Sequence, residues 1–246
     1  MIHSPFVFVP LASVDFALAN SNLPGKVIVV VLLVGSVFVW SLMLAKLRQL
    51  TDARRASDRF LGEYRKAGSP LALFLRRTGR TVESPLQNVY HAVCEDLYAY
   101  LEMKGKTADD LFAAPRGAPE PILDRNQTAA VRNLAERKVA DLVVLFENNM
   151  GMLATATTTA PFLGLLGTVW GVMDAFGGMV TKGSAMLSAV APGISGALLT
   201  TVVGLLVALP SAIGYNTLSD KIRRLTVQTD NFAQELVSDV ERLYGA

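Results

Sequence analysis

The chain has 246 residues, of which 51% are hydrophobic and only 18% are charged, and its mean hydropathy is +0.37. A soluble domain usually carries about one quarter charged residues, so this composition argues against an ordinary soluble domain. The net charge of +2 points to no class of partner, and the single cysteine excludes an intramolecular disulfide and a cysteine-based metal cluster.

The charged residues are absent from three long stretches of the sequence. These stretches lie between Lys26 and Lys46, between Glu147 and Asp174, and between Lys182 and Asp220. Each is long enough to cross a hydrocarbon layer of ~30 Å, which takes about 20 helical residues. We therefore predict an all-α integral membrane protein with three transmembrane helices, at 27–45, 154–178 and 194–214.

The basic residues predict how these spans are oriented. Apart from Lys26 and Lys182, every Lys and Arg lies on one side of the spans, with clusters directly after the first and the third. The positive-inside rule then places the N-terminus outside and residues 46–153 and 215–246 in the cytoplasm. Because the basic clusters adjoin apolar spans, they favour membrane anchoring over nucleic-acid binding.

The N-terminal part of the chain is expected to lie outside the hydrocarbon layer. Residues 1–26 lack the basic start of a secretory signal. Two interpretations stay open for them: a short segment on the outer membrane surface, or a partly ordered tail. The first span, 27–45, is rich in Val and Leu and has Trp40 near its inner end, which indicates a lipid-facing helix.

Residues 46–153 are predicted as a helical cytoplasmic region. Ser84 and Pro85 are typical of a helix start, and the amphipathic pattern that follows ends near Gly105. A further helix begins near Asp124, and because no Gly or Pro lies between Asp124 and Gly151 we expect it to run without a break into the second span. The region has no phosphate loop, metal-binding spacing or nucleophile elbow, so we expect no enzyme activity, cofactor or metal.

The second span contains a glycine-rich stretch, APFLGLLGTVWGVMDAF, from Ala160 to Phe176. Helical spacing places small residues on one face, which predicts contact with another helix: Pro161, Gly164, Thr168, Gly171 and Ala175. The Thr168 hydroxyl can both donate and accept, so it is a candidate for a polar path, or it bonds back to its own helix. Asp174 lies near the outer interface, where it is either solvated or paired with a lysine, or marks the place where ions enter.

A loop at 179–193 connects to the third span, which has a second small stripe at every fourth residue. That stripe consists of Gly196, Thr200, Gly204 and Ala208, with Thr201 beside it. Apolar residues continue at helical spacing through 215–246. We therefore expect the second and third helices to extend into a cytoplasmic helical bundle.

These two spans resemble those of a known family. The stretch 160–176 is similar to the second-span motif of the ExbB/TolQ (MotA/TolQ/ExbB) proton channel family, and VAPGISGALLTTVVGLLVALPSAIGYN, from Val190 to Asn216, is similar to its third-span motif. The resemblance implies a ring-forming subunit, expected as a homopentamer, of a motor in the bacterial inner membrane. In that arrangement residues 1–26 and 179–193 are periplasmic.

The resemblance also implies partners and site residues. The ring surrounds an ExbD- or TolR-like single-span protein whose Asp takes up the proton, and a TonB- or TolA-like protein transmits the force. The implied ion pathway consists of Thr168, Thr201 and Thr200, with Asp174 as a possible acid at its outer mouth. Pore-lining or helix-packing positions are Pro161, Gly164, Gly167, Gly171, Gly196, Ala197, Gly204, Pro210 and Asn216.

One position departs from the family pattern. Many members have a Glu where this chain has Gly196, so the partner's Asp has to do the proton binding or Asp174 assists. This departure leaves open whether the ion is H⁺ or Na⁺, and whether the branch is TolQ-like, ExbB-like or a gliding-motor paralogue. A non-conducting membrane scaffold is the alternative function. A transporter is disfavoured because the spans lack inverted-repeat symmetry.

Overall fold

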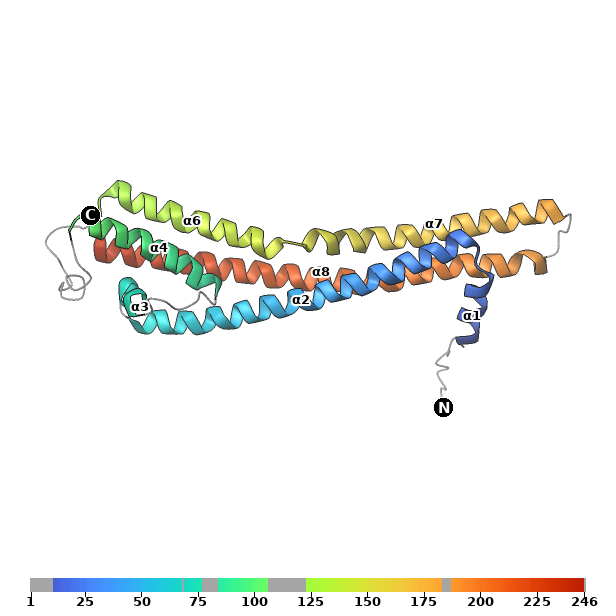
Figure 1. Cartoon of the computed structure of the whole chain (residues 1–246), viewed down its shortest axis with the longest axis horizontal. Coiled ribbons are helices and arrows are strands. Elements are labelled where there is room, and N and C mark those ends of the chain that lie inside the picture. Colours follow the sequence, from blue (N-terminus) through green and yellow to red (C-terminus); the bar gives the residue numbers. More distant parts are fainter. Residues whose placement is uncertain (1–10, 68, 77–83, 106–122, 183–186, 246) are drawn as a thin grey trace, which may run out of the picture. The chain divides into compact units, whose positions relative to one another are not determined.

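The computed structural model describes residues 11–67, 69–76, 84–105, 123–182 and 187–245 (Figure 1). Its elements are the helices α1 (Leu11–Asn20), α2 (Leu23–Ala67), α3 (Pro70–Arg76), α4 (Pro85–Met103), α6 (Arg125–Glu147), α7 (Met150–Lys182) and α8 (Leu187–Tyr244). In these ranges the β-type pairing is limited to an isolated bridge between Leu123 and Gly245. The predicted all-α fold is confirmed.

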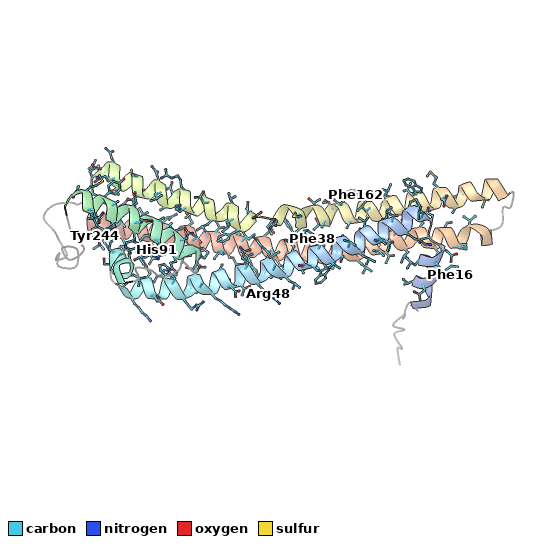
Figure 2. The ribbon with its side chains drawn as sticks, in the orientation of Figure 1. Phe16, Phe38, Arg48, His91, Phe162 and Tyr244 are labelled. Carbon is cyan, nitrogen blue, oxygen red and sulfur yellow. The ribbon has the colours of Figure 1, made fainter. Side chains whose placement is uncertain are left out.

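Long apolar helices confirm the prediction of an integral membrane protein. Within the described ranges, three helical stretches are long and apolar enough to cross a membrane: Leu23–Ala67, Arg125–Met179 and Val190–Tyr244. Large apolar side chains on them are exposed, for example Phe38 at 51% and Phe162 at 70%, both labelled in Figure 2. Such extensive apolar exposure is typical of a surface in contact with lipid or another protein chain.

The chain divides into two compact units. The first comprises residues 1–44 and 149–217, and the second comprises residues 45–148 and 218–246. Helices α2 and α8 therefore contribute residues to both units. The predicted spans fall within the first unit except for Ala45, the last residue of the first span, which belongs to the second unit.

In the first unit, α2, α7 and α8 share a small core. Leu32 of α2 packs with Ala160 of α7 and with Val207 and Ala208 of α8. Two of these four residues are alanines, and such small side chains let helix backbones approach one another closely. Close approach increases dispersion contact between helices, which membrane proteins use in place of the hydrophobic effect.

The helix α1 precedes α2, and a short non-helical turn at Ser21 and Asn22 connects them (Figure 1). Asn22 caps α2, because its Oδ1 accepts a hydrogen bond of 2.9 Å from the Gly25 amide. The described part of residues 1–26 includes the helix Leu11–Asn20, and both interpretations, a segment on the outer membrane surface and a partly ordered tail, stay predictions. Residues 1–10 lie outside the described ranges.

In the second unit, the predicted helix starts at Ser84 and Asp124 are confirmed. Ser84 Oγ accepts from the Gln87 amide at 3.1 Å. Asp124 and Gln127 form a reciprocal capping box at the start of α6. The core of this unit includes aromatic rings in edge-to-face contact, with centroids 5.2 Å apart and an angle of 84° between the planes of Tyr64 and Phe232.

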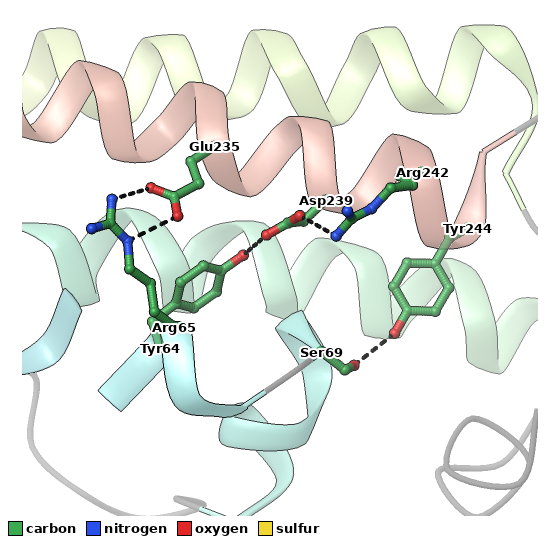
Figure 3. A network of polar contacts seen from close by, with 7 residues as sticks. All are labelled: Tyr64, Arg65, Ser69, Glu235, Asp239, Arg242 and Tyr244. Carbon is green, nitrogen blue, oxygen red and sulfur yellow. Dashed lines mark hydrogen bonds and ion pairs between the residues drawn. The ribbon is translucent and has the colours of Figure 1, made fainter. Parts of the chain in front are cut away.

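Polar contacts join the end of α2 to the end of α8 within the second unit (Figure 3). Tyr64 Oη donates to Asp239 Oδ2 at 2.8 Å, and Arg65 forms an ion pair of 3.0 Å with Glu235. Burial, and then the bond to Asp239, raise the pKa of Tyr64. The hydroxyl therefore stays protonated and acts as a donor.

The expectation of one unbroken helix from Asp124 into the second span is wrong. Helix α6 ends at Glu147 and α7 begins at Met150, with a turn at Asn148 and Asn149 between them. Asn149 has φ of 67°, in the left-handed region that ends many helices. Asn tolerates this conformation better than other non-glycine residues, so an asparagine pair can end a helix without Gly or Pro.

Candidate functional site

The small residues of α7 lie directly against those of α8. A Cβ placed on Gly204 would come within 2.6 Å of the Ala160 carbonyl oxygen and 3.1 Å of Gly164 Cα. A Cβ on Gly171 would come within 2.6 Å of Ala197 Cβ. At these points the two backbones are so close that only hydrogen fits.

This close contact brings three threonine hydroxyls together. Thr168 Oγ1 of α7 and Thr201 Oγ1 of α8 are hydrogen-bonded to each other. Both also reach the Gly164 carbonyl, at 3.2 Å and 3.1 Å. Thr200 Oγ1 lies 2.9 Å from the same carbonyl. We call these three residues the threonine cluster.

The cluster offers each hydroxyl more than one acceptor. Thr168 Oγ1 lies 3.1 Å from the Ala197 carbonyl as well as within reach of Gly164 and Thr201. A hydroxyl has one proton and two acceptor lone pairs, so Thr168 can donate to one of these oxygens at a time. The hydrogen-bond direction can therefore change without movement of a helix. Thr168 thus bonds to its own helix and also contacts α8, and its role in a polar path stays a prediction.

The three threonines differ in exposure. Thr200 is fully buried. It is enclosed by Gly167, whose Cβ would lie 2.5 Å from Thr200 Oγ1, and by Gly25, whose Cβ would lie 3.6 Å from Thr200 Cγ2. Thr168 and Thr201 are half-buried. Of these three side chains, only those of Thr168 and Thr201 have part of their surface exposed.

The other predicted site residues fall into three groups by exposure. The small ones are buried within the chain: Gly164, Gly167, Gly171, Gly196, Ala197 and Gly204. Pro161 and Pro210 are half-buried, and Asp174 and Asn216 are exposed. The Lys182 side chain, expected as a possible partner of Asp174, lies outside the described residues. Among the described residues, no three His, Cys, Asp or Glu side chains form a group that could hold a metal ion.

One contact of the site was not predicted from the sequence. Ser21, in the turn between α1 and α2, donates a hydrogen bond of 3.2 Å to the Gly196 carbonyl. It is 175 residues away in the chain. The sequence feature that could have indicated this contact is Gly196 itself, because a residue without a side chain leaves space that another segment can occupy.

Comparison with known proteins covers both helices of the cluster. The sequence model of the MotA/TolQ/ExbB proton channel family matches residues 103–231. The Tol-Pal system protein TolQ of Haemophilus influenzae is 31% identical over 228 residues, which cover 91% of each chain. The TolQ of Pseudomonas aeruginosa is 27% identical over 227 residues, or 92% of this chain and 91% of the relative.

A relative that is named ExbB, not TolQ, is similar over nearly the same share of this chain. The biopolymer transport protein ExbB of Pseudomonas putida is 27% identical over 223 residues. The aligned region covers 91% of this chain and 62% of that relative, so this chain spans less than two-thirds of its length. Similarity at this level extends to both TolQ and ExbB.

Proposed function

Because this chain belongs to the MotA/TolQ/ExbB proton channel family, we propose that it is a ring-forming subunit of an ion-driven motor in a bacterial inner membrane. The motor uses the proton motive force to energise outer-membrane transport or to maintain the cell envelope. The names of the relatives, biopolymer transport protein and Tol-Pal system protein, support these two roles. The proposal includes no enzymatic activity.

The observation that carries the proposal is the half-buried hydroxyl pair of Thr168 and Thr201. Between Glu147 and Asp220, Asp174 is the sole acid in the sequence, and it is exposed on α7. A threonine can donate and accept a hydrogen bond but cannot hold a charge at neutral pH. The pair therefore orients a proton carrier or a hydrated ion, and the group that titrates belongs to a partner.

The partner we propose is an ExbD- or TolR-like single-span protein with an Asp in its membrane helix. Copies of this chain, expected as five, surround it, and a TonB- or TolA-like protein carries the force away. The N-terminus is periplasmic and the C-terminus cytoplasmic. The energy source suffices for a rotation step, since one charge that falls through 100 mV releases about 2.3 kcal/mol.

Valine substitutions test the ion pathway, because valine has the shape of threonine without its hydroxyl. The chain is purified with its partner, reconstituted in vesicles, and assayed for proton flux under an imposed membrane potential. Thr168→Val and Thr201→Val should abolish flux while the complex keeps its stoichiometry. Thr158→Val and Thr217→Val are matched controls, since these exposed hydroxyls bond only to carbonyls of their own helices and should have no effect.

Two results of this assay would contradict the proposal. Full flux in both Thr168→Val and Thr201→Val would remove the hydroxyl pair from the pathway. An intact complex with no flux in the unchanged chain, under either a proton or a sodium gradient, would favour the alternative function, a non-conducting membrane scaffold. Native mass spectrometry of the copurified complex gives the stoichiometry and identifies the partner.

A further inference from the structure

We propose that Ser21, through its contact with Gly196, is a positioning residue for the Thr168–Thr201 pair. The turn between α1 and α2 then sets the geometry of the pathway from the N-terminal side of the chain. The consequence for ion movement rests on the proposed function. The positional effect itself depends only on the contacts within this chain.

The contact between Ser21 and Gly196 is made by backbone as well as by side chain. Ser21 is buried, with 6% of its surface exposed. A Cβ on Gly196 would lie 2.8 Å from Ser21 Cα and 2.9 Å from Ser21 N. Backbone atoms cannot rotate out of the way as a flexible side chain can. While the turn is in this place, residue 196 has to be glycine.

The hydroxyl of Ser21 fixes the register of this contact. Ser21 Oγ lies 2.8 Å from the Ala17 carbonyl of α1 and 3.2 Å from the Gly196 carbonyl of α8. The hydroxyl has one proton, so it donates to one of these two carbonyls at a time, and it lies between the end of α1 and α8. In this chain it supplies the polar group beside position 196, where residue 196 has no side chain of its own.

The neighbouring carbonyl of α8 belongs to the threonine cluster. Ala197 O accepts from Thr168 Oγ1 at 3.1 Å and from Thr200 Oγ1 at 2.7 Å. Two consecutive carbonyls of α8 thus accept hydrogen bonds from different segments. The Gly196 carbonyl accepts from Ser21 in the α1–α2 turn, and the Ala197 carbonyl accepts from Thr168 of α7. A shift of α8 at Gly196 would change the distance from Ala197 O to Thr168, and with it the hydroxyl pair.

The turn is held firmly enough to act as a fixed point. Asn22 caps the start of α2 through Gly25. Gly25 is buried, and a Cβ there would lie 3.6 Å from Thr200 Cγ2. The turn therefore contacts α8 at Gly196, and the first turn of α2 lies close to Thr200, which is one helical turn from Gly196 on the same face of α8.

A cysteine reporter in place of Thr201 tests the positional effect. The full-length Thr201→Cys chain is reacted in detergent with a small, water-soluble methanethiosulfonate, and the rate of modification is measured. Adding Ser21→Ala removes one hydrogen bond between segments and should change the rate about threefold, as expected for one such bond in a membrane protein. Adding Gly196→Ala displaces the turn and should change the rate tenfold or more, as expected for overpacking.

Two controls separate positioning from general loosening. Ser211→Ala removes another buried hydroxyl of α8, which donates to Val207 O at 2.7 Å, and should leave the reporter rate unchanged. A second reporter, Thr217→Cys, lies on the same helix at an exposed position and should not respond to Ser21→Ala. The native Cys94 is fully buried and should contribute no signal.

Unchanged reporter rates in both Ser21→Ala and Gly196→Ala, with helical circular dichroism retained, would overturn the proposal. Equal changes from Ser211→Ala, or at the Thr217→Cys reporter, would also overturn it. The reaction needs neither a partner nor a membrane potential. A failed flux assay with a shifted reporter rate would therefore contradict the proposed function and leave the positioning role of Ser21 standing.

Discussion

Replacing Gly164 by alanine should destabilise the first unit, because its neighbours on α8 are all backbone. The added Cβ would lie 2.8 Å from the Thr200 carbonyl oxygen and 3.0 Å from Thr201 Cα. An ordinary contact needs about 3.5 Å, so α7 and α8 would have to separate by about 0.7 Å. The matched control is Gly177→Ala on the same helix, where a Cβ meets nothing within 4 Å.

The separation has a cost that follows from these distances. The bonds from Thr201 to Gly164 O and from Thr168 to Ala197 O, each 3.1 Å, would lengthen to about 3.8 Å and be lost. At about 0.6 kcal/mol for each interhelical bond and ~1–3 kcal/mol for overpacking, Gly164→Ala should lower the free energy of unfolding by about 2–4 kcal/mol. Gly177→Ala should leave it unchanged or raise it by up to about 1 kcal/mol.

Titration of the purified protein from mild detergent into SDS, followed by circular dichroism, measures this difference. The two variants are compared with the unchanged chain under identical conditions. If Gly164→Ala and Gly177→Ala unfold at the same SDS fraction, the helices are not in contact at Gly164 and the reasoning is refuted. A gain of stability in Gly164→Ala alone would refute it equally.

Three further predictions concern other parts of the chain. Asn149→Val should lower the free energy of unfolding by about 1–2 kcal/mol and Asn149→Gly should not, because residue 149 has φ of 67°; equal effects in the same SDS titration would contradict this. Burial raises the pKa of Cys94 to about 12, so its thiol should resist N-ethylmaleimide at pH 8 until the protein unfolds, and rapid labelling of the native protein would contradict this. Tyr64→Phe removes a buried donor to Asp239 and should cost about 1.5–3 kcal/mol. Arg65→Ala removes only an exposed ion pair and should cost less, so equal losses in thermal unfolding would be inconsistent with this account.

The helices and their membrane character follow from the sequence because their causes are local. Stretches without charge predict membrane spans by length alone, and three such helices are present in the described ranges. The caps at Ser84 and Asp124 involve residues three positions apart, so they are visible in the sequence as well. The resemblance to the ExbB/TolQ family, made on two short motifs, is confirmed by the family match over residues 103–231.

The helix break at Asn148 and Asn149 shows the limit of local signals. Asparagine is only moderately unfavourable inside a helix, and it is also common at helix ends. Its presence alone does not decide between the two. The break depends on which conformation the surrounding packing favours, so the sequence predicted one helix where the structure has α6 and α7.

The sequence by itself determined that the chain is helical, that it lies in a membrane, and that threonines and glycines gather on two helices. Only the tertiary structure decided that Thr200 is enclosed while Thr168 and Thr201 stay partly accessible, and that Ser21 occupies the space beside Gly196. The physical reason is the sequence separation over which each interaction acts. Hydropathy and capping act over a few neighbouring residues, whereas these contacts join residues 33 and 175 positions apart and depend on how closely two backbones approach.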